Sequence, residues 1–162
     1  MKKRKYTVDT LVPMFIKAAA LRNEMLAMDF TDNGGAIHSA ERILDILGLC
    51  LNYPTLTHRN ALKTFTGAER SQDADRALKR GKPVHIEHLY PHRALTIAAI
   101  EKLGSNRKGA EERLIAFVKR SYRLVLLTAE ERARLDRINR SAVHPDRLAQ
   151  AGIKLAKTLT AS

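Results

Sequence analysis

Apolar residues recur at helical spacing through the first fifty residues. One set follows Asp9 and continues to the turn at residues 32–35: Leu11, Met14, Phe15, Ala18, Leu21, Met25 and Met28. A second set follows that turn: Ile37, Ala40, Ile43, Leu44 and Leu47. A stripe with a period near 3.6 is typical of an amphipathic helix. The pattern predicts two helices that form a scaffold over residues 1–50, the first beginning near Asp9 or Thr10 with Pro13 in its first turn.

The pattern changes after Pro54. Short helices are predicted over residues 57–65 and 68–80, an extended segment over 83–90 ending at Pro91, helices over 92–103 and 108–120, and a second apolar strand over 122–127. Thr128 and Glu131 form a capping box that starts a basic helix. Pro145 opens a last helix, with Leu148, Leu155 and Leu159 on its apolar side. We expect one domain over residues 1–162, mainly α with a small two-stranded β element embedded in helices.

Charge is distributed unevenly along the chain. The net charge is +12, and apolar residues make up 44% of the sequence. Residues 1–60 hold eight Lys/Arg against six Asp/Glu, four of the eight lying in Lys2–Lys5, whereas residues 61–162 hold twenty-one against eleven. A basic face on a neutral scaffold indicates a polyanionic partner, nucleic acid above all.

Two features bear on the compartment. The single cysteine, Cys50, lies in an apolar run, which favours a buried thiol and a reducing environment. No apolar run reaches the roughly 20 residues that span a bilayer. The sequence therefore predicts a cytoplasmic protein with no membrane partner.

One segment gathers residues that could carry chemistry. His85, Glu87, His88, Pro91 and His92 fall within eight residues and include three of the six histidines. A carboxylate can hold a divalent cation, and a neutral imidazole can take a proton from an attacking water. On a strand, neighbouring side chains point to opposite sides, but at a strand end Glu87 and His88 can converge. His85 shares a strand face with Glu87 and would either orient it or be solvated. His92 lies at helical spacing from His88, although Pro91 breaks that register.

The run Glu87-His88-Leu89-Tyr90-Pro91 resembles the HNH endonucleases, the His-Me finger group, with Glu for the commoner Asp. The resemblance covers residues 83–140 and implies a ββα-metal core, with His88 as general base and Glu87 as ligand to Mg²⁺ or a similar ion. It further implies duplex DNA as partner and suits a homodimer. Arg132 and Ala133 stand where the family usually places its last metal ligand, so that role would pass to Asn139 or His144.

The helix after the second strand is rich in arginine. Its cations, together with Arg123 and Lys108, are the residues we expect to bind phosphate: Arg132, Arg134, Arg137 and Arg140. A solvated helix with intrahelical acidic partners is the alternative. Three functions remain open at this point: a metal-dependent endonuclease, a catalytically inactive DNA- or RNA-binding protein, and a small helical inhibitor or regulator that binds another protein.

Overall fold

The chain divides into two compact groups of elements. The computed structural model describes residues 5–138 and 140–157. Unit 1 comprises Met1–Thr57 and His92–Tyr122, and unit 2 comprises His58–Pro91 and Arg123–Ser162, so the backbone passes between them three times. The two helices that separate the predicted strands therefore belong to unit 1, whereas the strands belong to unit 2. That the whole chain forms one domain stays a prediction.

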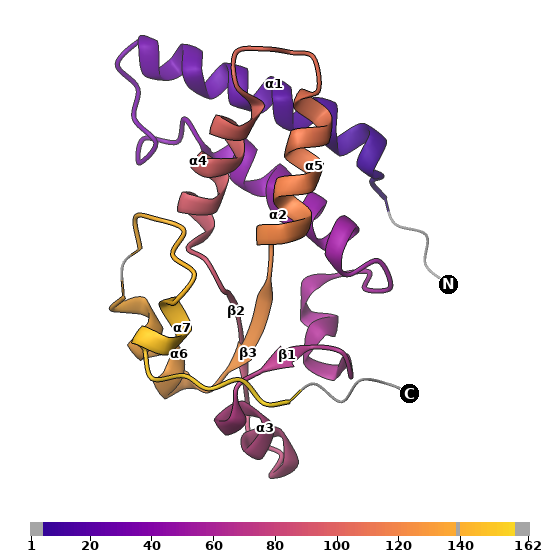
Figure 1. Ribbon diagram of the computed structural model, residues 1–162, viewed down its shortest axis with the longest axis vertical. Helices are drawn as coiled ribbons and strands as arrows, with labels where there is room; N and C mark the ends of the chain where they lie inside the picture. Colours follow the sequence, from indigo (N-terminus) through magenta and orange to yellow (C-terminus); the bar gives the residue numbers. More distant parts are fainter. Residues whose placement is uncertain (1–4, 139, 158–162) are drawn as a thin grey trace. The chain divides into compact units, whose positions relative to one another are not determined.

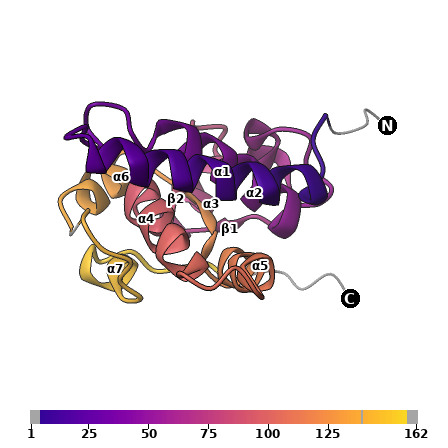
Figure 2. The same cartoon turned by 90° about the horizontal axis from the view of Figure 1, so that it is seen from above.

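Unit 1 is built from four helices: α1 (Val8–Ala27), α2 (His38–Asn52), α4 (His92–Leu103) and α5 (Ala110–Ser121). The helices α4 and α5 form an antiparallel pair joined by a short loop, and α1 crosses that pair steeply (Figures 1 and 2). Gly104 and Gly109 adopt positive φ at the two ends of this loop, a conformation that glycine takes without steric cost.

The buried face of α1 is only partly the predicted one. Thr7 and Thr10 form a capping box that starts the helix at Val8, so Pro13 lies in the second turn. Leu11, Phe15 and Ala18 are buried as predicted, but Met14 and Leu21 are 49% and 50% exposed. Val12 and Ala19 are buried in their place. The smaller side chains let α1 pack closely on its neighbours. The predicted face of α2 is largely confirmed, with Ile37, Ala40, Leu44 and Leu47 fully buried.

A tyrosine at the end of α5 joins it to α2. The Tyr122 ring is fully buried, and its hydroxyl donates a hydrogen bond to Asp45 Oδ1 at 2.6 Å. It lies so close to Gly48 that no larger residue could stand there without moving the ring. The Asn52 amide donates to the carbonyl oxygens of Val118, Lys119 and Tyr122 and so satisfies the C-terminus of α5.

Unit 2 surrounds a three-stranded sheet. Its elements are a 3₁₀ helix η1 (Arg59–Thr64), β1 (Glu69–Arg70), α3 (Gln72–Lys79), β2 (His85–His88), β3 (Leu124–Leu127), α6 (Ala129–Asp136) and α7 (Arg147–Gln150). The strand order is β1-β3-β2, with β1 parallel and β2 antiparallel to β3. All four residues of β3 are buried, as expected for a central strand covered on both faces.

A buried polar contact joins the starts of two helices in unit 2. The Ser71 hydroxyl caps α3 by accepting a hydrogen bond from Ala74 N at 2.9 Å, and it donates to Glu131 Oε2 at 2.5 Å. Glu131 also closes the predicted capping box with Thr128. Both side chains are buried, and Glu131 Oε2 also accepts a hydrogen bond from Thr128 N at 3.0 Å, so the contact fixes α3 relative to α6.

The predicted fold class is confirmed: the chain is mainly α with a small sheet. The sheet has a third strand, β1, which lies where the sequence predicted the start of a helix. The last predicted helix is only one turn, α7, after which Leu155 pairs with Ser71 in a β-bridge; Leu159 lies outside the described residues. No helix within the described ranges is long and apolar enough to cross a membrane.

Candidate nucleic-acid interface

Glu87 of β2 forms an ion pair with Arg132 of α6. The Arg132 Nε lies 2.7 Å from Glu87 Oε1, and the two side chains are 48% and 20% exposed. The pair follows from the fold, because β3 leads through Thr128 directly into α6, which packs beside β2. A guanidinium thus neutralises the carboxylate that the sequence assigned to a metal ion.

A second arginine, Arg147 of α7, is buried beneath the same region. It is 4% exposed, and its terminal nitrogens donate to Leu89 O at 3.2 Å, Leu135 O at 3.1 Å and His88 O at 3.4 Å. One guanidinium therefore joins the end of β2, the end of α6 and the start of α7. The Arg147 Nε is buried with no hydrogen-bond partner among the described residues.

The electrostatics around Glu87 are positive. Burial lowers the pKa of Arg147, and the nearby carboxylates of Asp136 and Glu87 partly offset that effect while Arg140 adds to it. Glu87 therefore lies in the field of at least two guanidinium groups, one of them in direct contact. Two positive charges oppose the approach of a divalent cation to this carboxylate. As placed, Glu87 does not fit the role of a metal ligand.

Strand pairing keeps Glu87 and His88 apart. The ladder runs from His85 opposite Leu127 to His88 opposite Leu124, and Leu89 N donates to Arg123 O at 2.9 Å beyond it. Because pairing continues past His88, neighbouring side chains keep pointing to opposite faces of the sheet. The convergence expected at the strand end is therefore not seen, since the backbone stays hydrogen-bonded to Arg123 one residue past His88.

The other histidines of this segment lie on two different elements. His85 lies two residues before Glu87 on the same face of β2. His92 is the first residue of α4 in unit 1, where its carbonyl oxygen accepts a hydrogen bond from Thr96 Oγ1 at 2.9 Å. Pro91 separates the strand from this helix, so His88 and His92 belong to different units.

Of the two distant residues suggested as replacement ligands, the structure describes only His144. Asn139 lies outside the described residues. His144 lies in the turn before α7, and its Nδ1 accepts a hydrogen bond from Asp146 N at 3.2 Å. One ring nitrogen of His144 is therefore used in shaping the turn.

The predicted phosphate-binding cations fall into two groups. Some are held by protein partners: Arg123 forms a bidentate pair with Glu69, with Nε at 2.9 Å from Oε2, and Arg134 Nε donates to Ala151 O at 3.0 Å. Arg137 and Arg140, at and beyond the end of α6, are exposed. Lys108 is also exposed but lies in unit 1, in the loop before α5.

Two arginines that hold the edge of β2 are not indicated by the sequence pattern. Arg59 of η1 donates to Ile86 O at 3.0 Å, and Arg147 donates to His88 O. Alternate carbonyl groups of a strand point the same way, so both bonds satisfy the outer edge of β2, which pairs with no strand on that side. Nothing in the local sequence distinguishes these arginines from solvated ones.

The two units differ in their excess of positive charge. Unit 2 carries fifteen Lys/Arg against eight Asp/Glu. Unit 1 carries fourteen against nine, and four of its cations are Lys2–Lys5. Apart from that tail, the positive charge belongs mainly to the unit that holds the sheet. Comparison with protein-family models, curated proteins and solved structures finds no match for this chain.

Proposed function

We propose that the protein binds nucleic acid through phosphate contacts made by unit 2. The observation that carries the proposal is the concentration of charge there, fifteen cations against eight acids, with Arg137 and Arg140 exposed at the end of α6. Lys and Arg side chains that neutralise phosphates release condensed counterions, which drives binding without regard to sequence. Only Phe65 and Tyr90 of the eight aromatic residues belong to unit 2, so base stacking is not invoked.

The Glu87–Arg132 pair supports binding rather than cleavage. A nuclease of the HNH kind needs the strand carboxylate for its cation, and here a guanidinium at 2.7 Å holds it. Arg132 also keeps about half of its surface exposed, which leaves donors directed to solvent. We therefore favour a binding protein whose β2–β3–α6 element presents arginine where an endonuclease would present metal ligands.

The test compares two double variants of equal charge change. Arg137→Gln with Arg140→Gln removes two cations of unit 2, and Lys17→Gln with Lys119→Gln removes two exposed cations of unit 1. Binding of a fluorescein-labelled 20-base-pair duplex is followed by anisotropy at fixed salt. We expect the unit 2 variant to weaken binding about tenfold and the unit 1 variant about twofold or less. Equal weakening by both variants would contradict the proposed interface.

A metal-dependent endonuclease is the second candidate, favoured by the position of Glu87 and His88 on the strand that precedes β3 and α6. Supercoiled plasmid is incubated with Mg²⁺, Mn²⁺ or Ni²⁺ and either the native protein or its His88→Ala and Glu87→Gln variants. The binding proposal predicts intact plasmid throughout. Cutting by the native protein that both substitutions abolish would establish this second candidate instead.

A further inference from the structure

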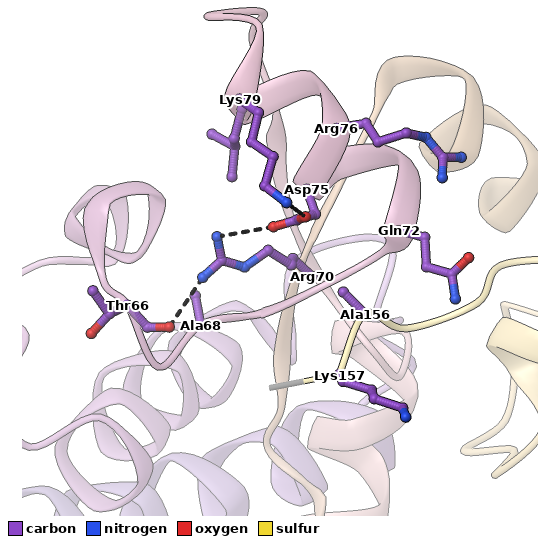
Figure 3. Close-up of a pocket in the computed structure, with 10 residues that line it drawn as sticks. Thr66, Ala68, Arg70, Gln72, Asp75, Arg76, Lys79, Ala156 and Lys157 are labelled. Carbon is purple, nitrogen blue, oxygen red and sulfur yellow. Dashed lines mark hydrogen bonds and ion pairs between the residues drawn. The ribbon is translucent and has the colours of Figure 1, made fainter. Parts of the chain in front are cut away.

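Unit 2 contains a large cavity on the side of α3. Its volume is about 1010 Å³, and it is bounded by α3, by residues 66–70 around β1, and by residues 156–157. Five charged side chains line it (Figure 3): Arg70, Asp75, Arg76, Lys79 and Lys157. Small apolar side chains, Ala68 and Ala156, form part of its wall. The cavity therefore offers four cations and one carboxylate to whatever enters it.

Asp75 holds two of these cations in place. Its carboxylate lies 2.7 Å from Lys79 Nζ and 3.6 Å from Arg70 Nη1, while Arg70 Nη2 donates to Thr66 O at 3.0 Å. Figure 3 shows the three charged side chains directed toward one another. The hydrogen bond from Lys79 lowers the pKa of Asp75, so this carboxyl is ionised at neutral pH. Arg70 and Lys79 are thus arranged before any ligand arrives.

The charge of the cavity remains positive after its ion pairs are counted. Arg76 pairs with Asp73, which lies outside the cavity. Lys157 has no ion-pair partner among residues 5–138 and 140–157. Four cations against Asp75 and Asp73 leave an excess of two positive charges. A smaller cavity of about 160 Å³ shares Gln72 and Arg76 with this one; its other charged residues are Lys154, Asp73 and Glu131, so it adds no net positive charge.

The residues that line the cavity indicate which class of anionic ligand it would bind. A single phosphate would fill little of this volume, which lies at the upper end of the range for ligand sites. None of the residues that line it is aromatic, so a base would find no ring to stack on. Several cations without a stacking platform suit the phosphodiester backbone of a polynucleotide better than a free nucleotide.

We propose that this cavity is a second phosphate-binding site, which receives the backbone of the nucleic acid bound by unit 2. The inference rests on the proposed function and names a contact surface on α3, distinct from the cations at the end of α6. Asp75 lowers affinity through its charge while keeping Arg70 and Lys79 in position.

The sharpest test uses a substitution expected to strengthen binding. Asp75→Asn removes one negative charge from the cavity, and Glu111→Gln makes the same change at an exposed position of unit 1. Affinity for the labelled duplex is measured for both. We expect Asp75→Asn to tighten binding about threefold and Glu111→Gln to change it by less than about 1.5-fold. Equal effects of the two substitutions would overturn the proposed site.

A second pair of variants tests the cations themselves. Lys79→Gln with Lys157→Gln is compared with Lys17→Gln and Lys119→Gln, after circular dichroism shows that both fold. We expect the cavity variant alone to weaken binding about fivefold or more and to make the salt dependence shallower by about one to two units of log–log slope. If the native protein binds and this variant matches its control, the cavity inference fails while the proposed function stands. If the native protein shows no salt-dependent binding, the proposed function itself fails.

Discussion

Replacing Gly48 with alanine isolates the contact that joins α2 to α5. A Cβ atom at position 48 would lie 2.2 Å from Cγ and 2.3 Å from Cδ2 of Tyr122, where ordinary contact begins at 3.4 Å. The ring is fully buried and its hydroxyl is held by Asp45 at 2.6 Å. It therefore has to move by about 1 Å or more into a packed interior.

Two effects of opposite sign determine how much Gly48→Ala changes the free energy of unfolding. Alanine favours a helix interior over glycine by about 0.5–1 kcal/mol. Overpacking a core costs about 1–3 kcal/mol and occasionally more, and weakening the buried Tyr122–Asp45 hydrogen bond adds roughly 1 kcal/mol. The packing cost is the larger, so we expect Gly48→Ala to lower the free energy of unfolding by about 2–3 kcal/mol. Urea titration followed by circular dichroism at 222 nm measures this change.

A double-mutant cycle separates the clash from any other effect of the substitution. In a Tyr122→Ala background the obstructing ring is absent, so Gly48→Ala should be neutral or stabilising by about 0.5–1 kcal/mol. The reasoning is refuted if Gly48→Ala stabilises the native protein, or if it costs the same with and without the Tyr122 ring.

Two further predictions concern charged side chains. Arg147→Met leaves three backbone carbonyls without their buried donor, so the free energy of unfolding should fall by about 2–4 kcal/mol in urea titration; an unchanged value would contradict the role given to Arg147. The side-chain hydrogen bond from Arg22 lowers the pKa of Asp32, so this pair stabilises the fold above pH 3.8 and loses its effect as pH falls through the lowered pKa. Asp32→Asn should therefore cost roughly 1 kcal/mol at pH 7 and progressively less in acid, whereas a cost independent of pH would show that the charge is irrelevant.

Local signals explain which elements the sequence predicts well. The limits of α4 match the prediction, since Pro91 precedes the helix and Gly104 at positive φ follows it. The Thr128–Glu131 capping box likewise places the start of α6 correctly, because a cap is a contact between near neighbours in the chain.

Long-range contacts explain the errors. The two residues of β1 are extended because they pair with Val125 and Leu126, more than fifty positions later, and their own sequence carries no strand pattern. The predicted inward face of α1 is wrong in part for a related reason: helical spacing alone does not show whether Met14 or Val12 faces the other helices.

The candidate site likewise combines features that the sequence shows with contacts that depend on the fold. The charge asymmetry is a property of composition, so the sequence shows it directly, but residues 92–122 belong to unit 1, which the sequence does not show. The departure at Arg132 was also visible, but its contact with Glu87 depends on how α6 packs beside β2. Arg147 could not have been identified, since its three acceptors come from segments up to 59 positions away.

The salt dependence of duplex binding by the native protein tests the central claim most directly. Affinity for the labelled 20-base-pair duplex is measured by anisotropy between about 50 and 300 mM NaCl. Binding through phosphate contacts predicts a straight log–log plot with a slope of about −3 or steeper, the value for three to four neutralised phosphates. A slope near zero, or no binding at the lowest salt, would contradict the account.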